Sequence, residues 1–201
     1  MLLPVDELNR FRSEISEIVR WVREEAERYD SIDFLIDLLA STVIPLVEEQ
    51  LGSEYDLAFD ESLDGWVHID PDESARAVAV WGEVGGKTFA QRVEEYAAGD
   101  LEHFASKVET LLETDGHRVR SEGRLDAGET LMGVGLTVGK TWRGVLDEKE
   151  RDAHVALEGV TLPLDGLFEI NGYKALAPGL FNVPELDCNC RCELEIRVLS
   201  E

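Results

Sequence analysis

Apolar residues in the first 50 positions recur at steps of three and four, which is the spacing of helices with a buried face. One amphipathic helix is predicted for residues 5–29. A second, more apolar helix is predicted for residues 32–51, with Asp30-Ser31 as the stop and cap before it and Gly52 at its end. Pro45 is expected to kink this helix, because proline lacks a backbone donor and clashes with the preceding turn. The pair forms either part of a core or an arm that docks onto a partner.

The helical spacing stops between residues 54 and 84. Two short β-prone runs occur there, Trp66–Ile69 and Ala77–Trp81. They predict strands or an irregular linker.

Helical spacing returns from a Thr88 cap to Ala98, and again over residues 101–114 behind an Asp100 cap. Beyond Gly116, five further glycines follow in close succession and predict mixed structure. They are Gly123, Gly128, Gly133, Gly135 and Gly139. Although Gly139-Lys-Thr141 resembles the end of a phosphate-binding loop, the preceding glycine spacing is wrong for one.

Short strands and turns are predicted after Lys140. Thr141–Arg143 and Val160–Leu164 are β-prone, and Asn171-Gly172 is typical of a tight turn. Residues 192–199 alternate between apolar and polar, which predicts a terminal strand. The predicted fold class is therefore α+β, with a helical N-terminal region and short C-terminal strands.

Charge sets this chain apart more than any other property of its composition. It has 43 acidic and 19 basic residues, a formal net charge of −24, and only five of the basic residues are Lys. This much like charge destabilises a compact state in ordinary salt, whereas molar salt reduces the screening length to about 3 Å. The composition therefore indicates a halophilic, haloarchaeal setting. It disfavours nucleic-acid binding through a basic face, because no cluster of Lys and Arg is present.

No apolar run reaches the roughly 18 residues that a membrane span needs. The N-terminal residues lack the basic and apolar regions of a signal peptide. We expect a soluble protein made in the cytoplasm, with no membrane partner.

Three cysteines lie within five residues, at Cys188, Cys190 and Cys192. In a strand, alternate side chains lie about 6.5–7 Å apart on one face, so they converge on one ion only if the chain turns there. A reducing cytoplasm favours thiolate ligands over a disulfide. His154 is the best fourth ligand for zinc, and His117 is an alternative or supporting one. The other interpretation is buried free thiols beside a structural histidine. A catalytic Cys-His pair is disfavoured, since nothing marks an oxyanion site.

Several separated motifs occur in a fixed order from Lys140 to Cys192. They are Lys140-Thr-Trp142, Asp147-Glu-Lys-Glu-Arg-Asp-Ala-His154, Leu157-Glu-Gly159, Phe168, Gly172, Pro178-Gly179 and Asn189-Cys-Arg-Cys192. The series resembles the Mu F-like head-morphogenesis family of tailed phages, over about residues 87–198.

The chain departs from the family pattern at several positions. Lys149 replaces an Arg, and Glu158 replaces an Asp. Other family branches have a cysteine-rich set that resembles a zinc site. Here Arg151 and His154 occupy two of its Cys positions, and Asp187 occupies its His position. The resemblance therefore implies a rearranged ligand set.

The resemblance implies a minor head protein of a virion, associated with the portal protein, the major capsid protein and the inner capsid, and active in assembly and in genome packaging or delivery. The expected domains are a helical arm (1–53), a linker or irregular strands (54–84) and an α+β head-morphogenesis-like domain (85–201). In that domain Trp142 and Phe168 anchor the core, and the metal ligands staple the short strands. We expect no enzymatic activity.

Two other classes of function stay open. One is an effector similar to ADP-ribosyltransferases, which some relatives resemble in fold; its sign would be a deep pocket with convergent Arg and Glu side chains. The other is a small zinc-stapled regulatory module of a haloarchaeal host.

Overall fold

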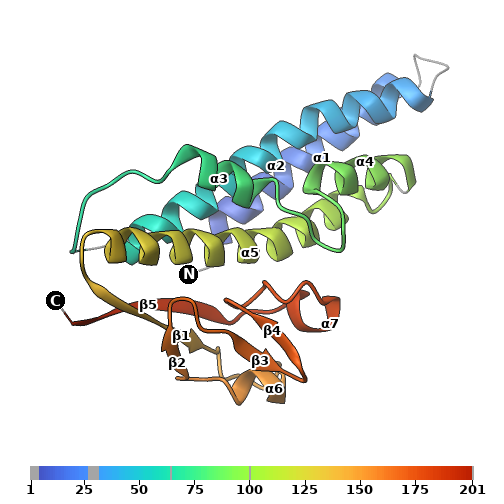
Figure 1. Ribbon diagram of the computed structural model, residues 1–201. Coiled ribbons are helices and arrows are strands. Elements are labelled where there is room, and N and C mark those ends of the chain that lie inside the picture. The colour runs from blue at the N-terminus through green and yellow to red at the C-terminus, as the bar shows by residue number, and fades with distance from the viewer. Residues whose placement is uncertain (1–4, 27–31, 64, 100, 201) are drawn as a thin grey trace. The chain divides into compact units, whose positions relative to one another are not determined.

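The computed structural model describes residues 5–26, 32–63, 65–99 and 101–200 (Figure 1). The chain divides into two compact units, and each is assembled from two stretches of sequence. The first unit is Met1–Gln50 with Gly82–Glu113, and the second is Leu51–Trp81 with Thr114–Glu201. The predicted α+β class is confirmed, with helices first and short antiparallel strands toward the C-terminus.

Helices form the first unit. They are α1 (Val5–Ala26), the first part of α2 (Ile32–Leu63), α4 (Phe89–Gly99) and the first part of α5 (Phe104–Gly133). Helix α1 follows the predicted pattern, because apolar residues at three- and four-residue steps are buried. Those residues are Phe11, Ile15, Val19 and Val22. The predicted caps at Asp30-Ser31 and Asp100 lie outside the described residues.

Helix α4 begins as predicted, behind Thr88. The Gln91 backbone N–H donates to the Thr88 hydroxyl at 3.3 Å, and the Thr88 N–H donates to the Gln91 side chain at 3.0 Å. This reciprocal capping box satisfies two donors that a helix start otherwise leaves open.

Helix α2 runs twelve residues past its predicted end, through Gly52 to Leu63. The reason is a second buried stripe at helical spacing, formed by Tyr55, Ala58, Phe59 and Leu63. Gly52 is a packing position, since a Cβ there would lie 2.0 Å from the Arg76 guanidinium. The prediction of strands between 54 and 84 is therefore wrong. The described residues there form the end of α2, a loop, α3 (Glu73–Val80) and one isolated bridge.

Helix α5 also continues far beyond its predicted end at 114. The prediction of mixed structure beyond Gly116 is wrong as far as Gly133. Two of the glycines lie within the helix, at positions where a side chain would clash with a neighbouring residue. A Cβ on Gly123 would lie 2.6 Å from the Tyr55 carbonyl oxygen, and one on Gly128 would lie 2.7 Å from Leu164. These glycines allow close packing on both sides of the helix.

The strands of the second unit confirm the predictions made after Lys140. Strands β1 (Thr137–Arg143), β2 (Thr161–Pro163) and β5 (Glu193–Ser200) form an antiparallel sheet in the order β2-β1-β5. Strands β3 (Phe168–Ile170) and β4 (Tyr173–Ala175) form a hairpin. Its turn is Asn171-Gly172, with φ of 53° and 85°, as a tight turn with two left-handed residues requires.

The core beneath this sheet is centred on Trp142, as predicted. Trp142 is fully buried, and its ring makes edge contacts with Phe168 at 5.2 Å and His154 at 5.6 Å between centroids. Phe168 is buried as well, so both predicted core anchors are confirmed. Within the described residues, no helix has the length and apolar character of a membrane span. The predicted domains are segments expected to fold independently, and their boundaries stay a prediction.

Candidate metal centre

Two short elements of the second unit carry the candidate ligands. Helix α6 (Asp152–Val155) buries His154, and the segment between α7 (Pro184–Asp187) and β5 carries the cysteines. Asn189 has a φ of 53°, so the chain turns between the first two cysteines. The Cys190 N–H donates to the Asp187 carbonyl at 3.1 Å, which closes this turn. The cysteines therefore do not continue as an extended strand.

The Asp187 carboxylate fixes the loop that leads into this turn. It accepts hydrogen bonds from the backbone N–H groups of Phe181 at 3.2 Å and Val183 at 3.1 Å. Arg151 donates to the Cys188 carbonyl at 2.5 Å and joins the loop to the segment that leads into α6. These contacts bring two parts of the chain about 40 residues apart to one place.

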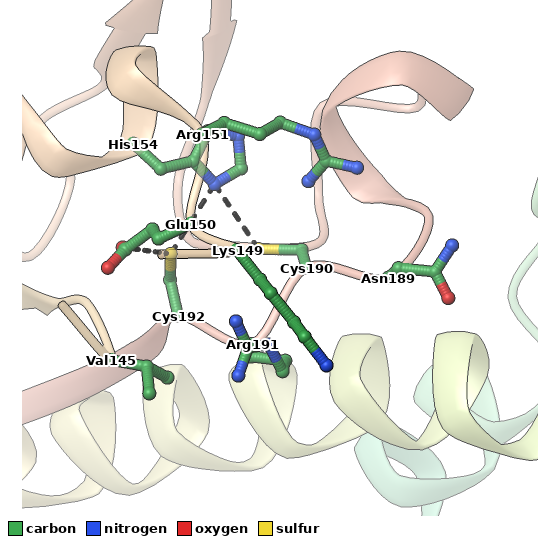
Figure 2. Close-up of a pocket in the computed structure, with 9 residues that line it drawn as sticks. All are labelled: Val145, Lys149, Glu150, Arg151, His154, Asn189, Cys190, Arg191 and Cys192. Atoms are coloured by element: carbon green, nitrogen blue, oxygen red, sulfur yellow. Dashed lines mark hydrogen bonds between the residues drawn. The ribbon is translucent and has the colours of Figure 1, made fainter. Parts of the chain in front are cut away.

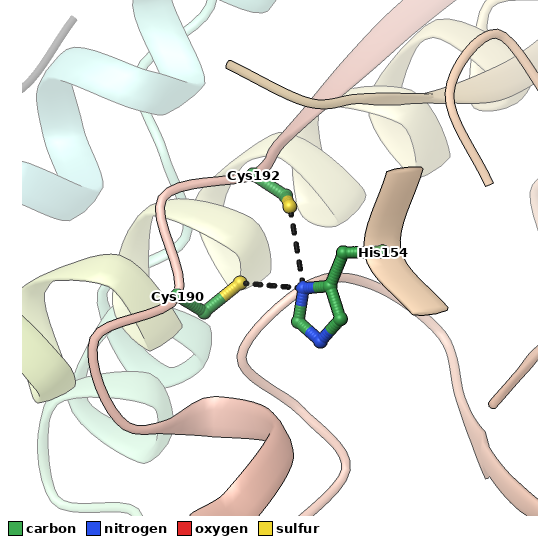
Figure 3. Close-up of side chains that lie close together, drawn as sticks. All are labelled: His154, Cys190 and Cys192. Atoms are coloured by element: carbon green, nitrogen blue, oxygen red, sulfur yellow. Dashed lines mark hydrogen bonds between the residues drawn. The ribbon is translucent and has the colours of Figure 1, made fainter. Parts of the chain in front are cut away.

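His154, Cys190 and Cys192 converge as a buried cluster (Figure 3). His154 Nδ1 lies 3.4 Å from Cys192 Sγ and 3.5 Å from Cys190 Sγ. The three ligand atoms all lie within 4.8 Å of one another, so the cluster can hold a metal ion.

The donor set and its spacing fit zinc. Tetrahedral zinc, with Zn–S bonds of about 2.3 Å and Zn–N bonds of about 2.0–2.1 Å, separates nitrogen and sulfur ligands by about 3.6 Å. The two observed separations, 3.4 and 3.5 Å, are close to that value. Thiolate and imidazole are also the ligands that zinc prefers in structural sites.

The two buried cysteines shift each other's pKa in opposite directions. A hydrogen bond with Cys192 lowers the pKa of the Cys190 thiol below its ordinary value against the effect of burial, and hydrogen bonds with His117 and His154 lower it as well. The Cys190 sulfur in turn raises the pKa of Cys192. A bound cation would stabilise both sulfurs as thiolates.

Of the four ligands predicted from the sequence, the structure brings together His154, Cys190 and Cys192. Cys188 is half-buried and is not in the cluster; it contributes its carbonyl to Arg151. His117, on α5, is buried, and its Nε2 forms a hydrogen bond with the Cys192 carbonyl. Its role as an alternative or supporting ligand stays a prediction.

Sequence reasoning missed Glu150. The Cys192 thiol donates to Glu150 Oε1 at 3.3 Å, and Glu150 also lines the small cavity beside the cluster (Figure 2). Nothing in the sequence distinguished this residue from its acidic neighbours in 147–152. The remaining lining residues are Val145, Lys149, Arg151, His154, Asn189, Cys190, Arg191 and Cys192.

Two characterised proteins are similar to part of this chain. The Minor head protein GP7 of Bacillus phage SPP1 is 34% identical over 106 residues, which are 52% of this chain and 33% of that protein. The NAD(+)–arginine ADP-ribosyltransferase EFV of Enterococcus faecalis is 27% identical over 107 residues, or 53% of this chain and 22% of that enzyme. The matched part is thus a third or less of either relative's length. No solved structure matches the chain.

A family model gives the wider assignment. The model described as Phage Mu protein F like protein matches residues 77–195, more than half of the chain. That range includes His154 and all three cysteines, and it ends within β5. The chain therefore belongs to the Phage Mu protein F like family.

Proposed function

We propose that this chain is a minor structural protein of a tailed-virus head that acts in head morphogenesis and is not an enzyme. The observation that carries the proposal is the family match over 77–195, together with the resemblance to a phage minor head protein over half of the chain. Within the particle, the protein belongs to the head interior or the portal vertex. There it aids assembly and genome packaging or delivery.

The test is its presence in particles. Purified virions from a producing host are expected to contain the chain at a few copies per particle, measured by quantitative mass spectrometry. Deleting its gene is expected to give empty or misassembled heads in electron micrographs. Absence from purified virions, with normal heads after deletion, would contradict the proposal.

The proposed partners are the portal protein and the major capsid protein, and the first unit offers a docking surface for the portal protein. A groove of about 800 Å³ lies between α2 and α4. Its apolar lining includes Ile36, Ala40 and Ile44, which recur every four residues along α2. Asp37 and Glu94 are exposed beside them. Lys87 also lines the groove, and its ammonium is paired with Glu95 at 2.6 Å.

An apolar stripe beside exposed carboxylates matches a basic amphipathic helix, and the portal protein is the proposed source of that helix. Its apolar side chains would cover the α2 stripe, and its Lys or Arg residues would face the carboxylates. A second copy of this chain is disfavoured, because its own charge is −24. Ile44→Lys is expected to abolish co-purification with the portal protein, whereas Val78→Lys, at an exposed position of α3, is expected to leave it unchanged. Equal binding by both variants would contradict this surface.

The arginine and glutamate groups of the second unit support the non-enzymatic proposal. Arg120 lies 3.6 Å from Glu54 and 3.5 Å from Glu193, and Arg124 lies 3.4 Å from Glu193. Both arginines are buried, so these groups are engaged as internal ion pairs. An assay for NAD⁺ hydrolysis and transfer of ADP-ribose to arginine is expected to show no activity above a heat-treated control.

We further propose that the cluster holds zinc and staples the tail of the second unit. The short elements between β1 and β5 include three strands and two helices of three or four residues each, which bury little area individually. Removing zinc with a chelator is expected to make residues 144–192 susceptible to limited proteolysis. Equal cleavage of this segment with and without metal would contradict the staple.

The acidic composition supports a high-salt, haloarchaeal setting for this protein. The free energy of unfolding is expected to rise as KCl is increased from 0.2 to 2 M, because salt screens the repulsion among carboxylates. Unfolding midpoints that are independent of KCl would contradict a halophilic protein.

A further inference from the structure

The three-ligand cluster leaves one position of a structural zinc site to be filled, since such sites are almost always four-coordinate. The three ligand atoms already identified are His154 Nδ1 and the sulfurs of Cys190 and Cys192. The fourth donor must come from a side chain beside them, and three candidates lie nearby: Cys188, His117 and Glu150.

Glu150 and Cys188 both lie outside the three-residue cluster as it stands. Glu150 Oε1 is nevertheless 3.3 Å from the Cys192 sulfur, whereas the Cys188 sulfur makes no such contact within the described residues. His117 directs Nε2 at the Cys192 carbonyl, so it supports the backbone of a ligand. Its other ring nitrogen, Nδ1, lies next to Gly179, where a Cβ would approach it to 2.5 Å. The ring is therefore confined where it stands.

Glu150 is held in position by three contacts. Oε1 accepts a hydrogen bond from the Cys192 thiol at 3.3 Å, and Oε2 accepts one from the Leu146 N–H at 2.5 Å. The carboxylate lies directly over Gly144, where a Cβ would come within 2.2 Å of Oε1. Any larger residue at 144 would displace it. Figure 2 shows the Glu150 side chain reaching toward the Cys192 sulfur.

The charges around the cluster favour a cation. A carboxylate and two cysteine sulfurs meet there, and bringing them together as anions is unfavourable without a positive partner. Of the basic residues that line the cavity, Arg151 donates to the Cys188 carbonyl and Arg191 donates to Asp147 at 2.5 and 2.6 Å, while Lys149 is exposed. A divalent metal ion would supply the positive charge.

We propose that Glu150 is the fourth ligand, so that this chain binds zinc through two thiolates, one imidazole and one carboxylate. The proposal rests on the zinc staple proposed above. The carboxylate oxygen that now accepts the Cys192 proton would bind the metal directly once that proton has left.

The experiment is zinc binding by the full-length protein and three variants, all prepared under reducing conditions. Affinity is measured by competition with a chromophoric chelator, and X-ray absorption at the zinc edge gives the ligand types. The wild type is expected to bind a single zinc with two sulfur and two nitrogen or oxygen ligands. Glu150→Gln is expected to bind at least about 10-fold more weakly. Glu150→Cys is expected to show three sulfur ligands.

Glu148→Gln is the matched control, because Glu148 is an exposed carboxylate two residues away. It is expected to bind zinc as the wild type does. Wild-type affinity in Glu150→Gln, or two sulfurs in Glu150→Cys, would overturn the assignment of Glu150 while leaving the zinc site intact. Three sulfurs in the wild type would assign Cys188 instead. A wild type that binds no zinc would overturn the staple itself, and with it this inference.

Discussion

The two units of this chain bury different kinds of side chain. Among the described residues, the first unit buries apolar side chains, whereas all of the buried polar and charged residues belong to the second unit. These are Glu54, Asp115, His117, Arg118, Arg120, Ser121, Arg124, Lys140, Thr141, His154 and Asp187. The family match also covers most of the second unit.

The two units illustrate two ways in which a sequence specifies its structure. Apolar burial has no direction, so the first unit needs only the right pattern and volume on its helices. Buried polar groups must meet particular partners, since an unpaired one is strongly unfavourable. Lys140 is an example: it is fully buried, and its ammonium donates to the Leu164 carbonyl at 2.5 Å. The second unit is therefore the part in which single polar residues decide the fold.

The largest effect is expected from breaking the buried ion pairs of the second unit. Arg120→Ala removes an ion-pair partner of the Glu54 carboxylate, which is itself buried. We expect a loss of about 3–5 kcal/mol in the free energy of unfolding, measured by urea denaturation. Arg197→Ala, whose side chain is 46% exposed, is the control and should change stability by less than about 0.5 kcal/mol.

A double variant sharpens this prediction. Replacing Arg120 by Met and Glu54 by Leu together removes both charges, and most of the lost stability should return. If the double variant is as unstable as the sum of its singles, the buried charges are not acting as a pair.

A smaller effect is expected from pH, through Glu122 on α5. Burial raises the pKa of this carboxyl from 4.5 to about 7, although Arg118 opposes the shift; Asp126 and Asp115 act in the same direction as burial. At pH values between these two pKa values, the Glu122 carboxyl is protonated in the folded state but ionised in the unfolded state. Stability contributed by this group should therefore fall as pH rises from about 4.5 through 7, by at most about 3 kcal/mol.

Urea midpoints at pH 5, 6 and 7.5 measure this dependence. Glu122→Gln cannot titrate, so its midpoints should decline less over the same range. Because burial also raises the pKa of Asp126, part of the slope is expected to stay. An unchanged slope in Glu122→Gln would show that this carboxyl is not the group responsible.

The smallest effect compares one glycine in each unit. Gly123→Ala in the second unit places a Cβ 2.6 Å from the Tyr55 carbonyl oxygen, and we expect a loss of about 1–3 kcal/mol. At Gly99, the last residue of α4, a Cβ would meet nothing within 4 Å. Gly99→Ala should therefore be neutral or stabilise by up to about 1 kcal/mol, measured as a shift in thermal midpoint. Similar destabilisation at both positions would contradict the packing role of Gly123.

The sequence predicted what depends on local patterns. Helix α1, the Thr88 cap of α4 and the Asn171-Gly172 turn follow from periodicity and from residue preferences near the backbone. Trp142 and Phe168, which both lie in family motifs, were predicted as core anchors, and both are buried. These features need no knowledge of distant neighbours.

The sequence could not predict what depends on contacts across the fold. Gly52 was interpreted as the end of a helix, and Gly123 as part of a glycine-rich tract of mixed structure. The residues that require their missing side chains are distant in sequence: Arg76 for the first and Tyr55 for the second. Glu150 was invisible for the same reason, since only the fold places it beside Cys192. His154, Cys190 and Cys192 were found because thiol and imidazole groups are few in this chain, whereas carboxylates are everywhere.

The central claim is that the tail of the second unit depends on a metal, whereas the first unit depends on apolar packing. Hydrogen–deuterium exchange with and without zinc tests this claim most directly. Peptides from residues 144–192 should exchange markedly faster after zinc is removed, and peptides from residues 33–50 and 89–99 should exchange at the same rate in both samples. An equal response in both sets of peptides, or no response in either, would contradict the account.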